Sequence, residues 1–186
     1  MPKFAIVFLL SAVFCNAGDM TYDVDQTVGI GSVTGFIETD GTIGVLGASN
    51  ILNWNLLLND GSTTFDLLGP LSGSNSQFGV SGSELSASTT EMFFDFSGAG
   101  WAMFQAPTLF STIDLWCTQG TIQCTGSTGT GEVLTTSDGN QFTGLSGTQV
   151  IASSVPEPSI FSLLGLGMAV TGLWKFRASR YLPKAK

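Results

Sequence analysis

Short apolar stretches separated by turn residues dominate the chain from Gly18 to Ser154. They are rich in Val, Ile, Thr and Phe and alternate with Gly, Ser and Asp, a pattern typical of strands joined by tight turns. No apolar repeat with the helical period of 3.6 persists there over the length that a helix requires. The 24 glycines of the chain favour the same interpretation. We therefore expect an all-β domain, an antiparallel β-sandwich or barrel of roughly eight to ten strands.

Two segments show the strand period of two most clearly. In each, apolar side chains occupy every second position, as expected when one face of a strand is buried. The side chains expected to face the core are Leu52, Trp54, Leu56 and Leu58 in residues 51–58, and Met92, Phe94 and Phe96 in residues 91–96.

Three Asp-Gly pairs separate such stretches and predict hairpins, because both central residues of a type I′ turn need positive φ. The third pair would close a hairpin over residues 130–151. Residues 72–88, with three glycines, are expected to form a long loop. The three pairs are Asp40-Gly41, Asp60-Gly61 and Asp138-Gly139.

Basic residues are confined to the two ends of the chain. Lys3 lies near the start and the other five lie within residues 175–186, whereas all of the 14 acidic residues except Glu157 fall between Gly18 and Ser154. Affinity for nucleic acids comes from Lys and Arg that displace counterions, so the central domain is not expected to bind them. The chain contains no histidine, which removes that side chain as a base, nucleophile or metal ligand.

Residues 1–17 have the pattern of a secretory signal peptide: Lys3, an apolar run over residues 4–14, and small residues up to Ala17. We expect export through the Sec translocon and cleavage by signal peptidase after Ala17. A membrane anchor fits less well, because this apolar run rises only about 16 Å against a hydrocarbon core of about 30 Å. Acylation of Cys15 also fits less well, because Phe14 stands where lipoprotein signals normally have Gly or Ala.

Cleavage after Ala17 leaves Cys117 and Cys124 as the thiols of the mature chain. An even pair in an exported protein predicts a disulfide. If residues 119–122 form a four-residue hairpin loop, the two cysteines face each other across two strands. So short a closed loop contributes about 2 to 3 kcal/mol. A metal site built from two thiols without a histidine is the weaker alternative.

The C-terminal region combines three signals. The tetrapeptide Val155-Pro156-Glu157-Pro158 is kept extended by its prolines. An apolar segment over residues 159–176 is then predicted to cross the membrane as a helix, with snorkelling basic side chains extending a marginal length. The basic cluster keeps residues 175–186 in the cytoplasm and the preceding domain outside. Its members are Lys175, Arg177, Arg180, Lys184 and Lys186.

This tail, residues 155–186, resembles the PEP-CTERM sorting signal of Gram-negative, often biofilm-forming bacteria in all three of its parts. The resemblance implies recognition by exosortase, a protease of the inner membrane, and cleavage near the Pro-Glu-Pro element. It also implies delivery of residues 18–154 to the cell surface or to extracellular polysaccharide. Glu157 would then serve recognition, since the catalytic residues of that reaction belong to exosortase. An ordinary tail anchor would leave the tetrapeptide unexplained.

Carboxylates offer two kinds of site. Asp19, Asp23 and Asp25 form the densest cluster and are candidates for Ca²⁺, the stronger alternative being a solvated acidic face. Asp23 with Asp25, or Glu38 with Asp40, could supply the acid and base of a glycoside hydrolase. No feature of the sequence singles out one of these carboxylates for a raised pKa. We therefore expect a structural or adhesive protein without enzymatic activity.

Three tryptophans could stack on sugar rings, which makes a calcium-assisted carbohydrate-binding module the alternative function. Trp54 lies in an alternating apolar strand and Trp116 lies beside a cysteine, and both settings are typical of cores. Trp101, between Gly100 and Ala102, is the tryptophan expected to be exposed and is the candidate ligand residue.

Overall fold

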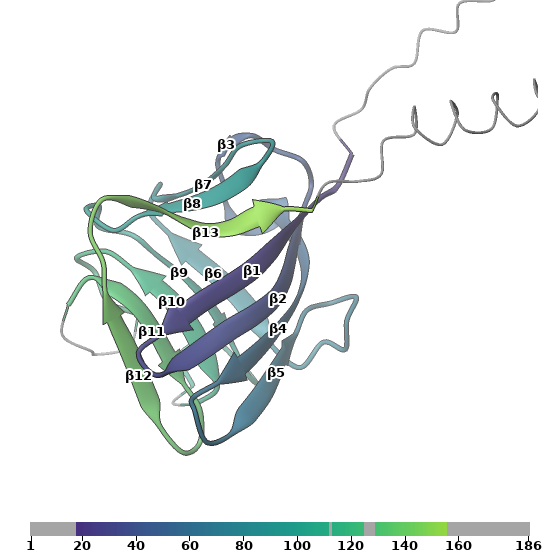
Figure 1. Ribbon diagram of the computed structural model, residues 1–186. Helices are drawn as coiled ribbons and strands as arrows, with labels where there is room; N and C mark the ends of the chain where they lie inside the picture. The colour runs from purple at the N-terminus through teal and green to yellow at the C-terminus, as the bar shows by residue number, and fades with distance from the viewer. Residues whose placement is uncertain (1–17, 112, 125–128, 156–186) are drawn as a thin grey trace, which may run out of the picture. The chain divides into compact units, whose positions relative to one another are not determined.

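The computed structural model describes residues 18–111, 113–124 and 129–155, which form two antiparallel sheets (Figure 1). The described residues contain 13 strands, more than expected, because several are only two to five residues long. The strands are β1 (Met20–Val28), β2 (Gly31–Thr39), β3 (Gly44–Val45), β4 (Ile51–Asn59), β5 (Thr64–Leu68), β6 (Gln77–Ser81), β7 (Leu85–Ala87), β8 (Glu91–Asp95), β9 (Trp101–Gln105), β10 (Leu115–Gln119), β11 (Gly131–Thr135), β12 (Asn140–Gly144) and β13 (Thr148–Ser154).

The prediction of an all-β, sandwich-like domain is confirmed. One sheet has eight strands in the order β3-β7-β8-β13-β1-β2-β4-β5, and the other has five in the order β12-β11-β10-β9-β6. The helical element of the described residues is a single 3-10 turn, η1 (Ala48–Asn50). Within the part of the chain that the structure describes, no helix has the length and apolar character needed to cross a membrane. The predicted signal peptide and transmembrane segment lie outside the described residues.

A continuous apolar core fills the space between the sheets. The eight-stranded sheet contributes side chains such as Ile37 and Leu56, and the five-stranded sheet contributes Phe104, Trp116 and Leu134. On and just after β8, the predicted inward set is confirmed: Met92, Phe94 and Phe96 are all buried.

A β-bulge corrects the prediction for β4. Trp54, Leu56 and Leu58 are buried as expected, but Leu52 is only half-buried. The register explains the difference: Glu38 of β2 pairs with Asn53 and Thr39 pairs with Ile51, so Leu52 is the extra residue. The neighbouring Asn53 is buried on the outer face of the sheet, where its Oδ1 accepts a hydrogen bond from the Leu71 N–H at 3.0 Å.

Two of the three predicted hairpins are present, but they are not closed by type I′ turns, because neither Asp60 nor Asp138 has a positive φ and each loop has four residues. Asp60 opens the loop between β4 and β5, and Asp138 lies in the loop between β11 and β12. Asp40-Gly41 does not form a hairpin turn, because residues 40–50 make an excursion through β3 and η1 before β4 returns beside β2.

Two further predictions about the chain's course are wrong. Residues 72–88 are not one long loop, since they contain β6, which belongs to the five-stranded sheet, and β7, which belongs to the eight-stranded sheet. The closing hairpin ends with β12, because β13 crosses to the eight-stranded sheet and pairs there with β1 and β8. Both errors concern pairing between distant segments, which local turn residues do not specify.

The described domain begins and ends at the same place. Tyr22 near the start of β1 pairs with Ser154 at the end of β13, as the adjacent ends of these strands in Figure 1 show. At the opposite end of β1, the Ile30 N–H donates to Gln141 Oε1 at 3.2 Å and the Gln141 Nε2 donates to Asp60 O at 3.3 Å. The turns that follow β1 and β4 therefore meet β12, at the end of β1 opposite to Tyr22 and Ser154.

Candidate functional site

The predicted sorting motif begins where the last strand ends. β13 finishes at Ser154, whose N–H donates to Thr90 O at 2.7 Å, and Val155 follows with 41% of its surface exposed. The other residues of the predicted sorting tail, from Pro156 to Lys186, lie outside the described residues, as does the predicted cleavage position Ala17. The motif residues are Pro156, Glu157 and Pro158, and the basic cluster is Lys175, Arg177, Arg180, Lys184 and Lys186.

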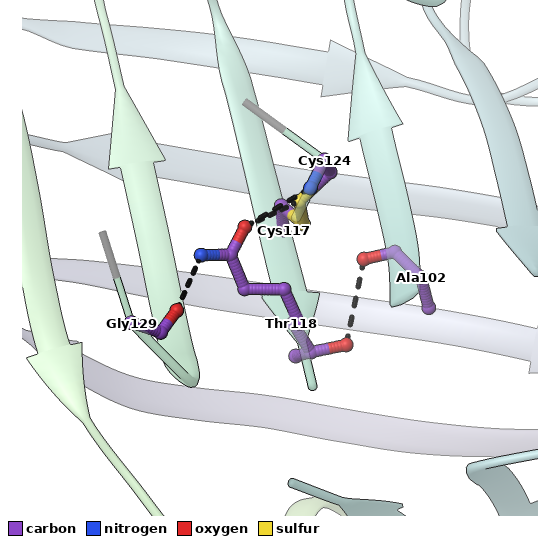
Figure 2. Close-up of a disulfide and its surroundings, with 6 residues drawn as sticks. Ala102, Cys117, Thr118, Cys124 and Gly129 are labelled. Carbon is purple, nitrogen blue, oxygen red and sulfur yellow. Dashed lines mark hydrogen bonds between the residues drawn. A yellow bond between two sulfur atoms is a disulfide. The ribbon is translucent and has the colours of Figure 1, made fainter. Parts of the chain in front are cut away.

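Cys117 and Cys124 form a disulfide, as predicted, but in a different setting (Figure 2). Cys117 lies in β10 and pairs with Val133 of β11, so Cys124 does not stand across a hairpin from it. Cys124 instead lies in the connection over residues 120–130. The prediction of a four-residue loop is wrong, because β11 begins only at Gly131.

Gln119 ties both arms of this connection to the end of β10. Its buried side chain accepts from the Cys124 N–H at 3.1 Å and donates through Nε2 to Gly129 O at 2.8 Å (Figure 2). The disulfide and Gln119 together hold the connection near the outer face of the five-stranded sheet, where Cys117, Met103, Leu115 and Val133 form a second, smaller core.

An aromatic pair, Trp101 and Phe110, stands on the same outer face. Trp101 of β9 is half-buried, Phe110 is 67% exposed, and their rings meet edge to face with centroids 5.7 Å apart. We call this pair the aromatic platform. The expectation that Trp101 is exposed is wrong, since it is half-buried, although it is the least buried of the three tryptophans in the described residues.

The loop that carries Phe110 is braced at several points. Ser111 donates from Oγ to Ala106 O at 2.8 Å, and the Leu109 N–H donates to Gln77 Oε1 at 3.3 Å. Leu109 also packs over β6 at Gly79, where an added Cβ would meet Leu109 Cδ1 at 2.8 Å. Phe110 itself has φ +63, a left-handed conformation that a bulky residue adopts only when its surroundings impose it.

The other two tryptophans belong to the core. Trp54 donates from Nε1 to Ser76 Oγ at 2.9 Å and packs edge-on against Phe104 at 5.3 Å. Trp116 stacks on Phe104, with the two rings nearly parallel. Trp54 is 4% exposed and Trp116 is 1% exposed, so neither presents a face to a ligand.

The predicted calcium cluster is not assembled. Asp19, Asp23 and Asp25 are exposed, and Asp23 and Asp25 share the outer face of β1. The residues beside Asp23 in register are Phe36 and Ser153, neither of which can add a carboxylate. Among the described residues, no group of three His, Cys, Asp or Glu side chains is placed to hold a metal ion.

In the second carboxylate pair, hydrogen bonds stabilise the ionised form of Asp40. Asp40 accepts hydrogen bonds from Asn50 Nδ2 at 2.9 Å and from the Thr42 N–H at 3.0 Å, and these bonds lower its pKa. A general acid needs the opposite shift. Glu38 lies on the outer face of β2, beside Thr21 and Asn53.

Carboxyls with raised pKa values occur at two positions that no sequence pattern marks. Burial raises the pKa of Glu132, in β11, to about 7. Burial also raises the pKa of Asp114, just before β10. Glu132 is 1% exposed and therefore closed to a polymeric substrate. All five residues of β11 are buried, because β11 is covered on both faces, and a strand this short offers no alternation that would identify the buried acid.

The chain was compared with protein-family models, with curated proteins and with solved structures, and no match was found in any of the three.

Proposed function

We propose that this chain is an exported, non-enzymatic surface protein whose tail is a PEP-CTERM-type signal processed by exosortase. Its β-sandwich would serve as a structural or adhesive component of the cell surface or of the extracellular polysaccharide matrix. The inner membrane would hold the chain only until the tail is cut.

The boundary at Ser154 carries this proposal. β13 makes its last backbone hydrogen bond, to Thr90, at Ser154, and Val155 is exposed directly after it. A cut at or beyond Val155 would therefore remove none of the strands of the described domain. A sorting protease requires this arrangement, since its product must stay folded after the anchor is gone.

The pairing of β1 with β13 supports the same topology. Since the described domain starts and finishes beside Tyr22 and Ser154, a signal peptide before it and an anchor after it would both leave from one end. The residues Ile30, Asp60 and Gln141 meet at the other end of the domain.

The test is the mass of the mature protein recovered from cells and medium of a strain that expresses the full chain. We expect a chain that starts at Gly18 and ends near Val155. In the variant Glu157→Gln, the tail should be retained and the protein should stay in the membrane fraction. Asp138→Asn, an exposed acid within the domain, is the matched control and should be processed normally. Surface protein that keeps residues 159–186 would contradict the proposal.

Carbohydrate binding is the second candidate function, and the aromatic platform favours it. Sugar rings stack on exposed aromatic faces, and Phe110 is the most exposed aromatic residue among those described. The bracing of its loop by Ser111 and Gln77 would spare a ligand the cost of ordering it.

A glycan array probed with the detergent-purified full chain, with and without a chelator, tests this candidate. Phe110→Ala should abolish binding, whereas Phe142→Ala, another exposed phenylalanine of the five-stranded sheet, should leave it unchanged. Loss of glycan binding in the presence of the chelator would show that calcium assists the binding. Absence of binding under both conditions, or equal binding by both variants, would remove the candidate.

A further inference from the structure

Glu132 places a carboxyl group inside the sandwich. It shares the inner face of β11 with Leu134, a member of the main core, and is 1% exposed. Its neighbours in register are Thr118 of β10 and Thr143 of β12, both neutral. Its Oε1 atom has no hydrogen-bond partner among the described residues.

The elements packed against β11 offer this carboxyl no opposite charge. β10 and β12 contain no acidic or basic side chain, and the one cysteine of β10 is in the disulfide. The chain from Phe4 to Trp174 contains no Lys, Arg or His at all. The titratable groups of the facing strands β1 and β2 are Tyr22, which is buried, and Asp23, Asp25 and Glu38, which lie on the outer face of the other sheet.

A small cavity lies between the sheets at Thr118, the β10 neighbour of Glu132, although Glu132 itself does not line it. Its volume is about 10 Å³, close to the smallest space that holds one water molecule, and Thr118 and Trp116 line it together with Ile37 and Met92 from the opposite sheet. The Trp116 Nε1–H has no hydrogen-bond partner among the described residues. Because Glu132 faces the core between the sheets, water that solvates its charged form would have to enter between them.

We propose that Glu132 is an internal proton-binding site, held as the neutral acid in the folded domain, and that release of its proton to solvent weakens the packing between the two sheets. The neutral acid needs one acceptor for its O–H, whereas an unpaired carboxylate in the interior carries a large desolvation cost. Protonation of Glu132 therefore makes the domain more stable in acidic than in alkaline surroundings.

The raised pKa of Glu132 sets the direction in which stability changes with pH. The pKa of Glu132 is raised from 4.5 to about 7 in the folded protein, so the folded state binds the proton more tightly than the unfolded state. The contribution to stability is complete below pH 4.5 and is lost as the pH rises through about 7.

Urea unfolding of the detergent-purified full chain, followed by tryptophan fluorescence, tests the proposal. Between about pH 5 and about pH 8, the equilibrium constant for unfolding of the wild type should rise roughly 50- to 100-fold. Glu132→Gln should remove most of this rise. Asp138→Asn should retain it, and Asp114→Asn isolates the other buried acid whose pKa is raised.

A flat wild-type profile, or a rise that persists in Glu132→Gln, would overturn the proposal. An infrared measurement on the wild type gives an answer even if the variant does not fold. The band of a protonated carboxyl should be present near pH 6 and disappear by about pH 9. Its absence near pH 6 would equally overturn the proposal.

Discussion

At the scale of single residues, Asp60 shows how one carboxylate can join two hairpins. Its Oδ1 accepts from the N–H groups of Ser62 and Thr63, both at 2.7 Å, and its Oδ2 accepts from the Thr136 hydroxyl in the loop between β11 and β12. The hydrogen bond from Thr136 is the largest of the effects that hold the pKa of Asp60 well below its ordinary value. Two loops from different sheets are thereby fixed to each other.

Replacing Asp60 should therefore destabilise the domain selectively. Asp60→Asn exchanges one acceptor oxygen for an NH₂ group that opposes the donors, and we expect its melting temperature to fall by several degrees. Because the folded-state pKa is depressed, the carboxylate's contribution is present above pH 3.8 and lost as the pH falls below it. Thermal melts from neutral pH downward should show the two proteins converging in acid.

Asp138→Asn is the control for this experiment, because Asp138 also precedes a glycine in a hairpin loop but is exposed. Its melting temperature should equal that of the wild type. If the melting temperature falls equally in both variants, aspartate stabilises each turn by itself, and the hydrogen bonds between the two loops add nothing. The sequence could not distinguish these two Asp-Gly pairs, since the difference lies in Thr136, which comes from another sheet.

At the scale of elements, the disulfide stabilises the connection between β10 and β11. It closes a sequence separation of 7 residues, and the loop-closure entropy removed from the unfolded chain contributes about 2 to 3 kcal/mol. The double variant Cys117→Ala, Cys124→Ala should lose about that much free energy of unfolding in a urea titration. Wild-type protein with a reductant should behave similarly, whereas the variant should not respond to the reductant. A variant as stable as the oxidised wild type would contradict this account.

Local pattern predicts elements well where one strand face is buried and poorly where pairing is distant. Met92 and Phe94 alternate with half-buried residues, so their strand could be recognised from the sequence. β7 is short and pairs with β3 and β8, a choice made by tertiary contacts. The candidate sites divide in the same way. The predicted sorting motif is contiguous in the sequence and can be recognised there. The exposure of Phe110 and the burial of Glu132 depend instead on a braced loop and a covering sheet, which the sequence pattern does not specify.

At the scale of the whole molecule, the described domain is a polyanion without counter-charges of its own. The outer face of the eight-stranded sheet carries carboxylates from four strands, and none of them has a basic neighbour. Such a surface keeps copies apart at low ionic strength and lets them crowd when salt screens it. This property suits a protein displayed densely on a cell surface. The carboxylates are Asp23, Asp25, Glu38, Asp66, Glu91 and Asp95.

Salt should accordingly stabilise this domain. The Debye length falls from about 30 Å at 0.01 M to about 3 Å at 1 M, which removes most of the repulsion between exposed carboxylates. We expect the melting temperature of the full chain to rise with sodium chloride. Asp23→Asn should raise it at low salt and lose that advantage at high salt, since it deletes one repelling charge. Asp60→Asn should lower it at every salt concentration, because its loss is of hydrogen bonds that salt does not screen. If melting is independent of salt, or if Asp23→Asn is no more stable than the wild type at low salt, the carboxylates do not destabilise one another.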